Sequence, residues 1–151
     1  MAENKNTILI VDDDIGPRQA LRFILQDNYH VLTCEDTQQA LNAVANNEID
    51  LVLLDIRMPK MDGLELLKAM KLINPNLEAV FVTAYPNTES AITAMEYGAY
   101  DYIVKPFDKE KIEEVVKKGI MLKTQKELKR NMPLNLASSI LKKLSPKKSN
   151  S

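Results

Sequence analysis

The sequence predicts an α/β protein: a doubly wound, five-stranded parallel sheet with helices on both faces and a helical tail at the C-terminal end. Short, unbroken apolar runs rich in β-branched residues recur along the chain. They are too short for helices and typical of strands that are covered on both faces. Between them, apolar residues recur every three or four positions, as in helices. Such alternation of strand and helix favours a parallel sheet.

Four segments show the strand pattern clearly, and a fifth shows it with mixed polarity. The four clear strands are Ile8–Val11, Leu51–Leu54, Ala79–Val82 and Tyr102–Val104. The fifth segment, Tyr29–Cys34, carries more polar residues. We therefore expect it at an edge of the sheet, where one side of a strand faces solvent.

The expected helices are bounded by residues that favour helix starts and stops. The starting residues of the five helices, in chain order, are Pro17, Thr37, Asp62, Thr88 and Asp108. We expect the third helix to stop before Asn74-Pro75, because the residue before a proline avoids helical angles. The fourth is expected to end at Gly98, a favoured residue just past a helix.

Composition places the chain among ordinary globular proteins, with 45% hydrophobic and 27% charged residues. No run of about 18 apolar residues occurs, so no membrane span is expected. The N-terminal segment lacks the apolar region of a secretory signal, and Cys34 is the single cysteine. These features predict a cytoplasmic location and exclude an internal disulfide.

Chemically distinctive residues follow the strands. They are Asp12 and Asp13 after the first strand, Asp55 after the third, Thr83 at the end of the fourth, and Lys105 after the fifth. In a doubly wound sheet the carboxyl ends of the strands form the ligand site, so we expect these side chains to converge. Two carboxylates about 5 Å apart repel by roughly 3 kcal/mol at an effective dielectric constant near 20. A cation should therefore accompany them.

Three carboxylates with one lysine suit Mg²⁺, which prefers oxygen ligands and keeps several waters. An aspartate beside Mg²⁺ and an ammonium group can act as a nucleophile toward phosphorus, while both cations stabilise the phosphoryl oxygens. The Thr83 hydroxyl is placed to hydrogen-bond the new phosphoryl group. Asp14 is expected to be a solvated acid or the cap of the first helix.

Four stretches at these spacings resemble the response-regulator receiver domain of two-component signal transduction. They are "ILIVDDD", "LVLLDIRMPKMDG", "VFVTAY" and "DYIVKPF". The resemblance covers residues 6–122 and implies a flavodoxin-like fold with strand order 2-1-3-4-5. Residues 123–151 are then expected to form a basic helical tail, too short for a separate output domain of the usual kinds.

The resemblance also implies roles for single residues. Asp55 falls on the phosphoacceptor, and Asp12 and Asp13 fall on the acidic pair that binds Mg²⁺. The backbone carbonyl of Arg57 would supply a further Mg²⁺ ligand. Lys105 falls on the family's lysine, and the Lys105-Pro106 peptide bond would be cis.

Signalling would follow from two further positions. Thr83 and Tyr102 fall on the switch hydroxyl and the switch aromatic of the family. The resemblance implies a phosphoryl donor in the form of a sensor histidine kinase or a phosphotransfer protein, so His30 is not expected to be the donor. It also implies a downstream protein target that contacts the fourth helix, the fifth strand and the fifth helix. Self-phosphorylation and slow autodephosphorylation would be the only reactions, without turnover as an enzyme.

Two other classes of protein share part of this pattern. A haloacid-dehalogenase-like phosphatase also uses a strand-end aspartate, Mg²⁺ and lysine, but it requires a threonine where Gly16 stands. It also requires an acidic pair after the lysine, where only Asp108 is near. An FMN-binding protein needs a glycine- and hydroxyl-rich loop after the first strand, and three aspartates there would repel the phosphate.

The tail differs from the rest of the chain in charge. Residues 1–122 hold 12 Lys/Arg and 20 Asp/Glu, a net charge of −8, whereas residues 123–151 hold 8 Lys/Arg and one Glu, a net charge of +7. We expect the fifth helix to continue toward Lys129-Arg130, weakened at Gly119. Pro133 is then expected to start a second, short helix.

This second helix is expected to be amphipathic. Its apolar positions are Leu134, Ala137, Ile140, Leu141 and Leu144, and its basic positions are Lys142, Lys143, Lys147 and Lys148. A solvated, frayed tail and a helix that docks on a partner or on a second copy of the chain, as in a homodimer, both remain open. DNA binding is not expected, because the tail has no aromatic residue and few positive charges.

Overall fold

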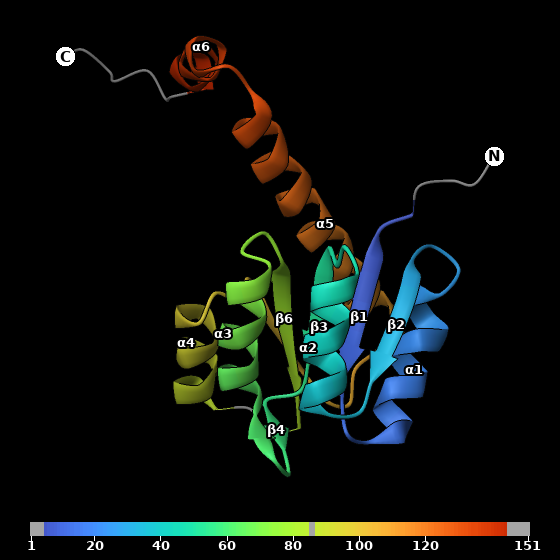
Figure 1. Cartoon of the computed structure of the whole chain (residues 1–151). Helices are drawn as coiled ribbons and strands as arrows, with labels where there is room; N and C mark the ends of the chain where they lie inside the picture. Colours follow the sequence, from blue (N-terminus) through green and yellow to red (C-terminus); the bar gives the residue numbers. More distant parts are fainter. Residues whose placement is uncertain (1–4, 85–86, 145–151) are drawn as a thin grey trace.

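The computed structural model describes residues 5–84 and 87–144, and strands alternate with helices along most of that length (Figure 1). In chain order the elements are β1 (Thr7–Val11), α1 (Ile15–Leu25), β2 (His30–Cys34), α2 (Thr37–Asn46), β3 (Leu51–Leu54), β4 (Arg57–Met58), β5 (Met61–Asp62), α3 (Gly63–Ile73), β6 (Glu78–Thr83), α4 (Thr88–Glu96), β7 (Asp101–Val104), α5 (Lys109–Asn131) and α6 (Leu134–Leu144). All five predicted strands are present, with ends within one residue of the predicted ones.

Five of the strands form one parallel sheet in the order β2-β1-β3-β6-β7. If only the strands of this sheet are counted, the order is 2-1-3-4-5, as predicted. The strand of mixed polarity, β2, lies at an edge, which confirms its expected position. The chain moves outward from β1 to β2 and then returns to β3 on the other side. The switch in strand order therefore lies between β1 and β3, where this fold forms its site.

Helices cover both faces of the sheet, and each face has its own core. Every residue of β3 and β6 is buried, which explains their unbroken apolar runs. One core includes buried residues of α2, α3 and α4, such as Val44, Leu67 and Ala94. The other includes buried residues of α1 and α5, such as Leu21 and Ile112. Figure 1 shows α2 and α3 in front of the sheet and α5 behind it.

Aspartate side chains cap the first two helices. The Gly16 amide donates to Asp14 Oδ1 at 3.1 Å, so Asp14 is the cap of α1, one of the two roles expected for it. The prediction that Thr37 caps the second helix was wrong. The cap is Asp36, whose Oδ1 accepts from the Gln39 amide at 2.8 Å, and Thr37 is the first helical residue. A carboxylate interacts more strongly than a hydroxyl with the positive end of the helix dipole.

The other predicted helix boundaries are confirmed. Asp108 caps α5 by accepting from the Lys111 amide at 2.7 Å. α3 ends at Ile73, immediately before Asn74-Pro75. Gly98 follows α4 with a φ of 101°, a left-handed conformation that favours glycine.

A short antiparallel hairpin, β4–β5, connects β3 to α3 and was not predicted. Gly63 closes this connection, and its amide donates to the Ile56 carbonyl at 2.7 Å. A Cβ at Gly63 would lie 2.2 Å from the Asp55 carbonyl oxygen, so only glycine permits this approach. The glycine thereby fixes the backbone immediately after β3.

α5 runs without interruption from Lys109 to Asn131, which confirms the predicted extension. Gly119 was expected to weaken this helix, but it allows a close contact with the sheet instead. A Cβ at Gly119 would lie 2.2 Å from the Tyr100 hydroxyl oxygen and 2.4 Å from Leu51 Cδ1. The absence of a side chain therefore lets α5 pack directly against β3.

Two ion pairs hold α5 to the amino-terminal edge of the sheet. Lys123 pairs with Asp50, which precedes β3, and Lys126 Nζ lies 2.6 Å from Glu78 Oε1 at the start of β6. Asp50 also accepts a hydrogen bond from the Thr7 amide at 2.7 Å. We call Asp50, Glu78, Lys123 and Lys126 the amino-edge clamp. It fastens α5 to the sheet beyond residue 122.

α6 begins immediately after Pro133 and lies apart from the sheet in Figure 1. This confirms the predicted second helix of the tail. Three positions of the predicted tail helix fall outside what the structure describes: the side chain of Ala137, and residues Lys147 and Lys148. Within residues 5–84 and 87–144, none of the helices is both long enough and apolar enough to cross a membrane.

Candidate functional site

The backbone ladder continues past the strand ends and brings the predicted site residues to one edge of the sheet. The Asp55 amide donates to the Val11 carbonyl at 3.0 Å, which places Asp55 beside the end of β1. The Lys105 amide donates to the Thr83 carbonyl at 2.8 Å, which places Lys105 beside the end of β6. Parallel pairing of β1 with β3, β3 with β6 and β6 with β7 thus aligns the residues that follow them.

Lys105 connects two of the three predicted carboxylates. Its Nζ donates to Asp12 Oδ2 at 2.7 Å and to Asp55 Oδ2 at 3.2 Å. The side chains of all three residues are largely buried. The Lys105-Pro106 peptide bond is cis, as the resemblance implied. One ammonium group therefore serves two carboxylates that come from different strands.

Asp13 adds a third carboxylate to this pair. One oxygen from each of Asp12, Asp13 and Asp55 forms a group whose members all lie within 4.8 Å of one another. Asp12 is 2% exposed, whereas Asp13 is exposed, so the cluster opens to solvent on the Asp13 side. Three carboxylates and one shared lysine leave a formal charge of about −2. Oxygen donors on an edge that is open to water fit a hard divalent cation such as Mg²⁺.

Burial and charge shift the proton affinities of the two central groups. Burial raises the pKa of Asp55 above its ordinary value, and the negative charge of Asp12 raises it further. Lys105 and the Arg57 amide oppose this rise only in part. Burial lowers the pKa of Lys105, but its contacts with Asp12 and Asp55 outweigh this effect, so the net pKa is raised. The lysine therefore stays charged.

Backbone amides hold the remaining carboxylate oxygens in place. Asp12 Oδ1 accepts from the Asp14 amide at 2.9 Å. Asp55 Oδ1 accepts from the Arg57 amide at 3.1 Å, so Arg57 begins β4 directly beside the Asp55 carboxylate. The Arg18 guanidinium donates to the Asp12 backbone carbonyl at 2.9 Å. The protein backbone itself thus orients the carboxylates of Asp12 and Asp55.

The two predicted switch residues lie on neighbouring strands near this cluster. Thr83 ends β6 and is 1% exposed. Tyr102 lies on β7 and packs against the core that contains α3 and α4. Its hydroxyl is buried and has no hydrogen-bond partner within residues 5–84 and 87–144. By contrast, His30 is the first residue of β2, so it lies at the amino end of the strands and away from this cluster.

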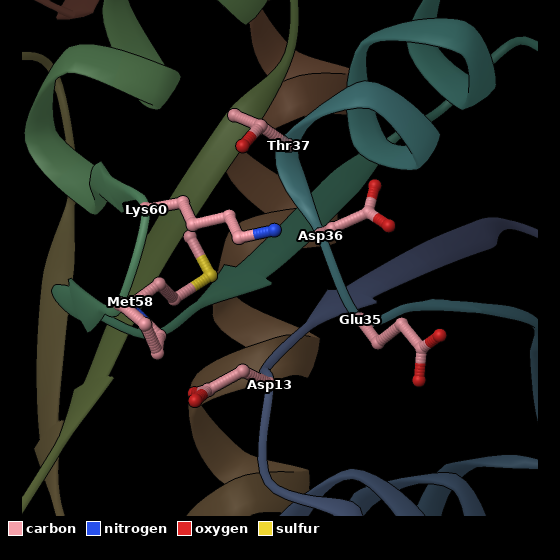
Figure 2. Close-up of a pocket in the computed structure, with 7 residues that line it drawn as sticks. Asp13, Glu35, Asp36, Thr37, Met58 and Lys60 are labelled. Atoms are coloured by element: carbon pink, nitrogen blue, oxygen red, sulfur yellow. The ribbon is translucent and has the colours of Figure 1, made fainter.

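A pocket of about 290 Å³ beside Asp13 was not predicted. Its lining residues are Asp13, Glu35, Asp36, Thr37, Met58, Pro59 and Lys60. Figure 2 shows the Lys60 amino group extending across the pocket toward the loop that carries Asp36. Part of the pocket is formed by the hairpin after Asp55. Each strand of this hairpin has only two residues, which is too short to give a strand pattern in the sequence.

An apolar groove of about 400 Å³ lies on the other side of the cluster and was also not predicted. It is lined by Gly16, Pro17, Ala20, Ala84, Lys105, Pro106 and Phe107. Phe23 is exposed, and its position seven residues after Gly16 puts it on the same side of α1. Small residues on α1 leave the groove open, and a pattern based on large apolar residues cannot reveal such a feature.

The fold agrees with comparisons to known proteins. The family model described as "Response regulator receiver domain" matches residues 8–117. Sporulation initiation phosphotransferase F of Bacillus subtilis is 40% identical over 118 residues, which cover 78% of this chain and 95% of that protein. The crystal structure of a CheY-like receiver domain protein from Methanospirillum hungatei matches with a TM-score of 0.77 and 29% identity, covering 82% of this chain and 99% of that one.

The chain belongs to the response-regulator receiver domain family. It is therefore a domain of phosphorylation-dependent two-component signalling. The transcriptional regulatory protein ZraR of Escherichia coli is 37% identical over 121 residues. These residues are 80% of this chain but only 27% of ZraR, so the chain spans about a quarter of such regulators.

Proposed function

We propose that Asp55 accepts a phosphoryl group from the phosphohistidine of a partner kinase or phosphotransfer protein. One observation carries this proposal: Lys105 bridges Asp55 and Asp12 at an edge where three carboxylates share one lysine. An oxygen of Asp55 forms a bond to phosphorus while the phosphorus–nitrogen bond of the donor breaks. The electron pair of that bond returns to the imidazole nitrogen.

Asp12, Asp13 and Asp55, with the backbone carbonyl of Arg57, are the proposed ligands of Mg²⁺. The spacing of the three carboxylates supports this assignment. When bound, Mg²⁺ neutralises the phosphoryl oxygens and so lowers the barrier to attack by an anion. Lys105 holds the Asp55 carboxylate in position beforehand and offers its positive charge to the transferred group. Asp55 and Asp12 are oriented by backbone amides, so little reorganisation is needed.

Thr83 and Tyr102 are the proposed switch. The Thr83 hydroxyl would hydrogen-bond the phosphoryl group, and the space it leaves would accommodate the Tyr102 ring. The Tyr102 hydroxyl supports this assignment, because it is buried without a hydrogen-bond partner among the described residues. Such an unpaired group costs about 1–3 kcal/mol, so the present position of the ring is sensitive to small changes nearby. The response would appear on the surface of α4, β7 and α5, where a downstream protein binds.

The groove between α1 and the Lys105–Phe107 segment is the proposed approach for the phosphoryl donor. Lys105 is part of both the groove and the carboxylate cluster, so a helix lying there would bring a histidine toward Asp55. Exposed Phe23 extends the apolar surface along α1. Burial of such apolar surface is the main source of binding free energy in protein complexes.

We further infer that the chain acts in the cytoplasm and does not bind DNA. Its reactions would be limited to self-phosphorylation and slow autodephosphorylation, without turnover of a free substrate. We also propose that residues 6–122 act as the receiver domain and that residues 123–151 form a basic helical tail with a separate role. The amino-edge clamp fastens the first part of that tail to the receiver domain.

The proposal is tested by incubating the full chain with Mg²⁺ and a small acyl-phosphate donor. Mass spectrometry after reduction of the acyl phosphate then locates the modified residue. We expect one phosphoryl group, on Asp55, and none in Asp55→Asn. Phosphate on another side chain, or incorporation that does not require a divalent cation, would contradict the assignment. Sustained hydrolysis of a generic phosphate monoester would instead favour a phosphatase.

A further inference from the structure

α6 has an exposed apolar surface at both of its ends. Leu134 is 88% exposed and Leu144 is 75% exposed, and Ile140 between them is exposed as well. The three residues lie within the predicted apolar stripe of the helix. Large apolar side chains gathered on one helix favour binding to another surface.

The charge around α6 is of one sign. From Leu128 to the end of the chain there are six lysines and arginines and no acid. Lys142 and Lys143 lie in the last turn of α6, and both are exposed. A surface that receives α6 should therefore combine apolar residues with acidic ones.

α4 carries such a surface. Ile92 is 54% exposed and Met95 is also exposed, three residues apart on the outer side of the helix. Glu89 and Glu96 lie three and four residues from Ile92, so the acids flank the apolar pair. Both are exposed, and within the described residues neither makes an ion pair. The two helices thus match in apolar character and are opposite in charge.

The α4 surface of the same chain is badly placed to receive α6. α4 packs in the core on one face of the sheet, through Ala94, whereas α5 packs on the other face, through Ile112. The amino-edge clamp holds α5 on its own face as far as Lys126. Only Met132 and Pro133 separate α5 from α6, and two residues span at most about 7 Å. α6 therefore lies beyond the amino ends of the strands, well separated from α4 of the same chain (Figure 1).

We propose that α6 docks on the α4 surface of a second copy of this chain. Leu134, Ile140 and Leu144 would pack against Ile92 and Met95, with Lys142 and Lys143 opposite Glu89 and Glu96. The same contact formed in both directions gives a closed two-fold dimer. The docking does not require phosphorylation. Its sensitivity to phosphorylation rests on the proposed function, because α4 belongs to the surface assigned to the switch.

Charge reversal on each side of the contact provides the test. Sedimentation equilibrium of the unphosphorylated full chain measures the dimer dissociation constant. We expect Glu89→Lys with Glu96→Lys, or Lys142→Glu with Lys143→Glu, to raise this constant at least about tenfold. The matched control is Glu48→Lys, which changes an exposed acid outside α4 and should leave the constant unchanged. Circular dichroism checks that each variant is folded.

Mixing the two charge-reversed proteins separates docking between copies from docking within one chain. In the mixture, the lysines of one protein face the glutamates of the other at both contacts, so a mixed dimer should form with nearly the native dissociation constant. Docking within one chain would leave both proteins unrestored by mixing. That outcome, or a full chain that stays monomeric at millimolar concentration, would overturn the proposal. A dimer that survives both charge reversals would do the same. None of these measurements depends on phosphorylation of Asp55, so the two proposals fail independently.

Discussion

The acidic residues at the two ends of the parallel strands differ in how they are paired. We call the end where the strands begin the amino edge and the end where they stop the carboxyl edge. At the amino edge, Lys123 pairs with Asp50 and Glu127, Lys126 pairs with Glu78, and Lys71 adds a further positive charge near Glu78. At the carboxyl edge, Lys105 alone is shared by Asp12 and Asp55, and Asp13 adds further negative charge. Acids and lysines are thus balanced in charge at the amino edge, whereas negative charge is in excess at the carboxyl edge.

The difference separates structural carboxylates from those that we propose to be functional. Glu78 is nearly as buried as Asp12, so burial alone does not distinguish the two edges. What distinguishes them is the number of available cations, because a paired carboxylate has little left to offer a ligand. An excess of carboxylates is unfavourable for folding, and such an arrangement is typical of sites that a cation completes.

The largest expected effect is the loss of phosphorylation in Asp55→Asn. Asp50→Asn, at the other end of β3, is the matched comparison. Asp55→Asn should abolish phosphorylation by a small acyl-phosphate donor, because an amide cannot replace the attacking carboxylate. Asp50→Asn makes the same chemical change five residues earlier and should leave phosphorylation intact. It should lower the free energy of unfolding by about 1–3 kcal/mol, because Lys123 loses a charged partner. Mass spectrometry and urea denaturation measure the two effects, and loss of phosphorylation in Asp50→Asn would remove the distinction between the edges.

The next effect tests the amino edge through Lys126. Lys126→Ala leaves the carboxylate of Glu78 buried without its ion pair, and we expect a loss of about 1–3 kcal/mol in the free energy of unfolding. The half-exposed lysine and the nearby Lys71 keep the effect below that of a fully buried pair. Lys129→Ala, one turn further along α5, is the matched control and should change stability by less than about 0.5 kcal/mol. Equal stability of the two variants would show that the clamp does not hold α5.

The two edges also differed in how far the sequence could predict them. The carboxyl edge was predicted residue by residue, because Asp12, Asp55 and Lys105 each follow an apolar run that ends at the same side of a parallel sheet. At the amino edge nothing pointed to Glu78, which adjoins an apolar run and shows no periodic relation to a lysine 48 residues later. Long-range ion pairs depend on the exact course of α5 and carry no local pattern.

Close contacts were missed for a similar reason. Gly119 looked like a weak point in a helix, since propensity counts only local free energy. In the structure it is the position where α5 meets Tyr100 and Leu51. Residue type alone predicts Thr37 as a cap, whereas the cap is the adjacent Asp36. Propensity does not locate a helix boundary to a single residue. The pocket beside Asp13 forms between loops, the β4–β5 hairpin and the start of α2, and the groove beside Lys105 forms between loops and small residues of α1. Neither surface has a periodic signal in the sequence.

A smaller effect on stability is expected at Asp13, which is exposed and adds to the excess of negative charge. In the presence of a chelator, Asp13→Asn should raise the free energy of unfolding by about 1 kcal/mol or less, because it removes repulsion from Asp12 and Asp55 across partly solvated distances. In Mg²⁺ the order should reverse, since wild type gains stability from binding that the variant has weakened. Urea denaturation with and without Mg²⁺ measures both. A variant that is less stable than wild type under chelation would contradict an excess of charge at this edge.

The last effect concerns Cys34, which ends β2 at the carboxyl edge. This effect is a change in stability with pH that is absent at neutral pH and develops only above pH 9. Burial raises the pKa of the Cys34 thiol from 9.0 to about 11, and the charge of Asp36 adds to the rise. The folded protein therefore keeps the thiol proton over a pH range in which the unfolded chain has lost it. Stability from this group is complete below pH 9 and declines as the pH rises toward 11. Comparing the pH dependence of unfolding of wild type and Cys34→Ala isolates this contribution, because the constant cost of removing the sulfur cancels. We expect the two curves to be parallel at neutral pH and to converge above pH 9, with slow thiol labelling of the native protein at pH 8. Parallel curves up to pH 11, or rapid labelling at pH 8, would mean that solvent reaches the end of β2. The open part of the carboxyl edge would then extend beyond the Asp13 side of the cluster.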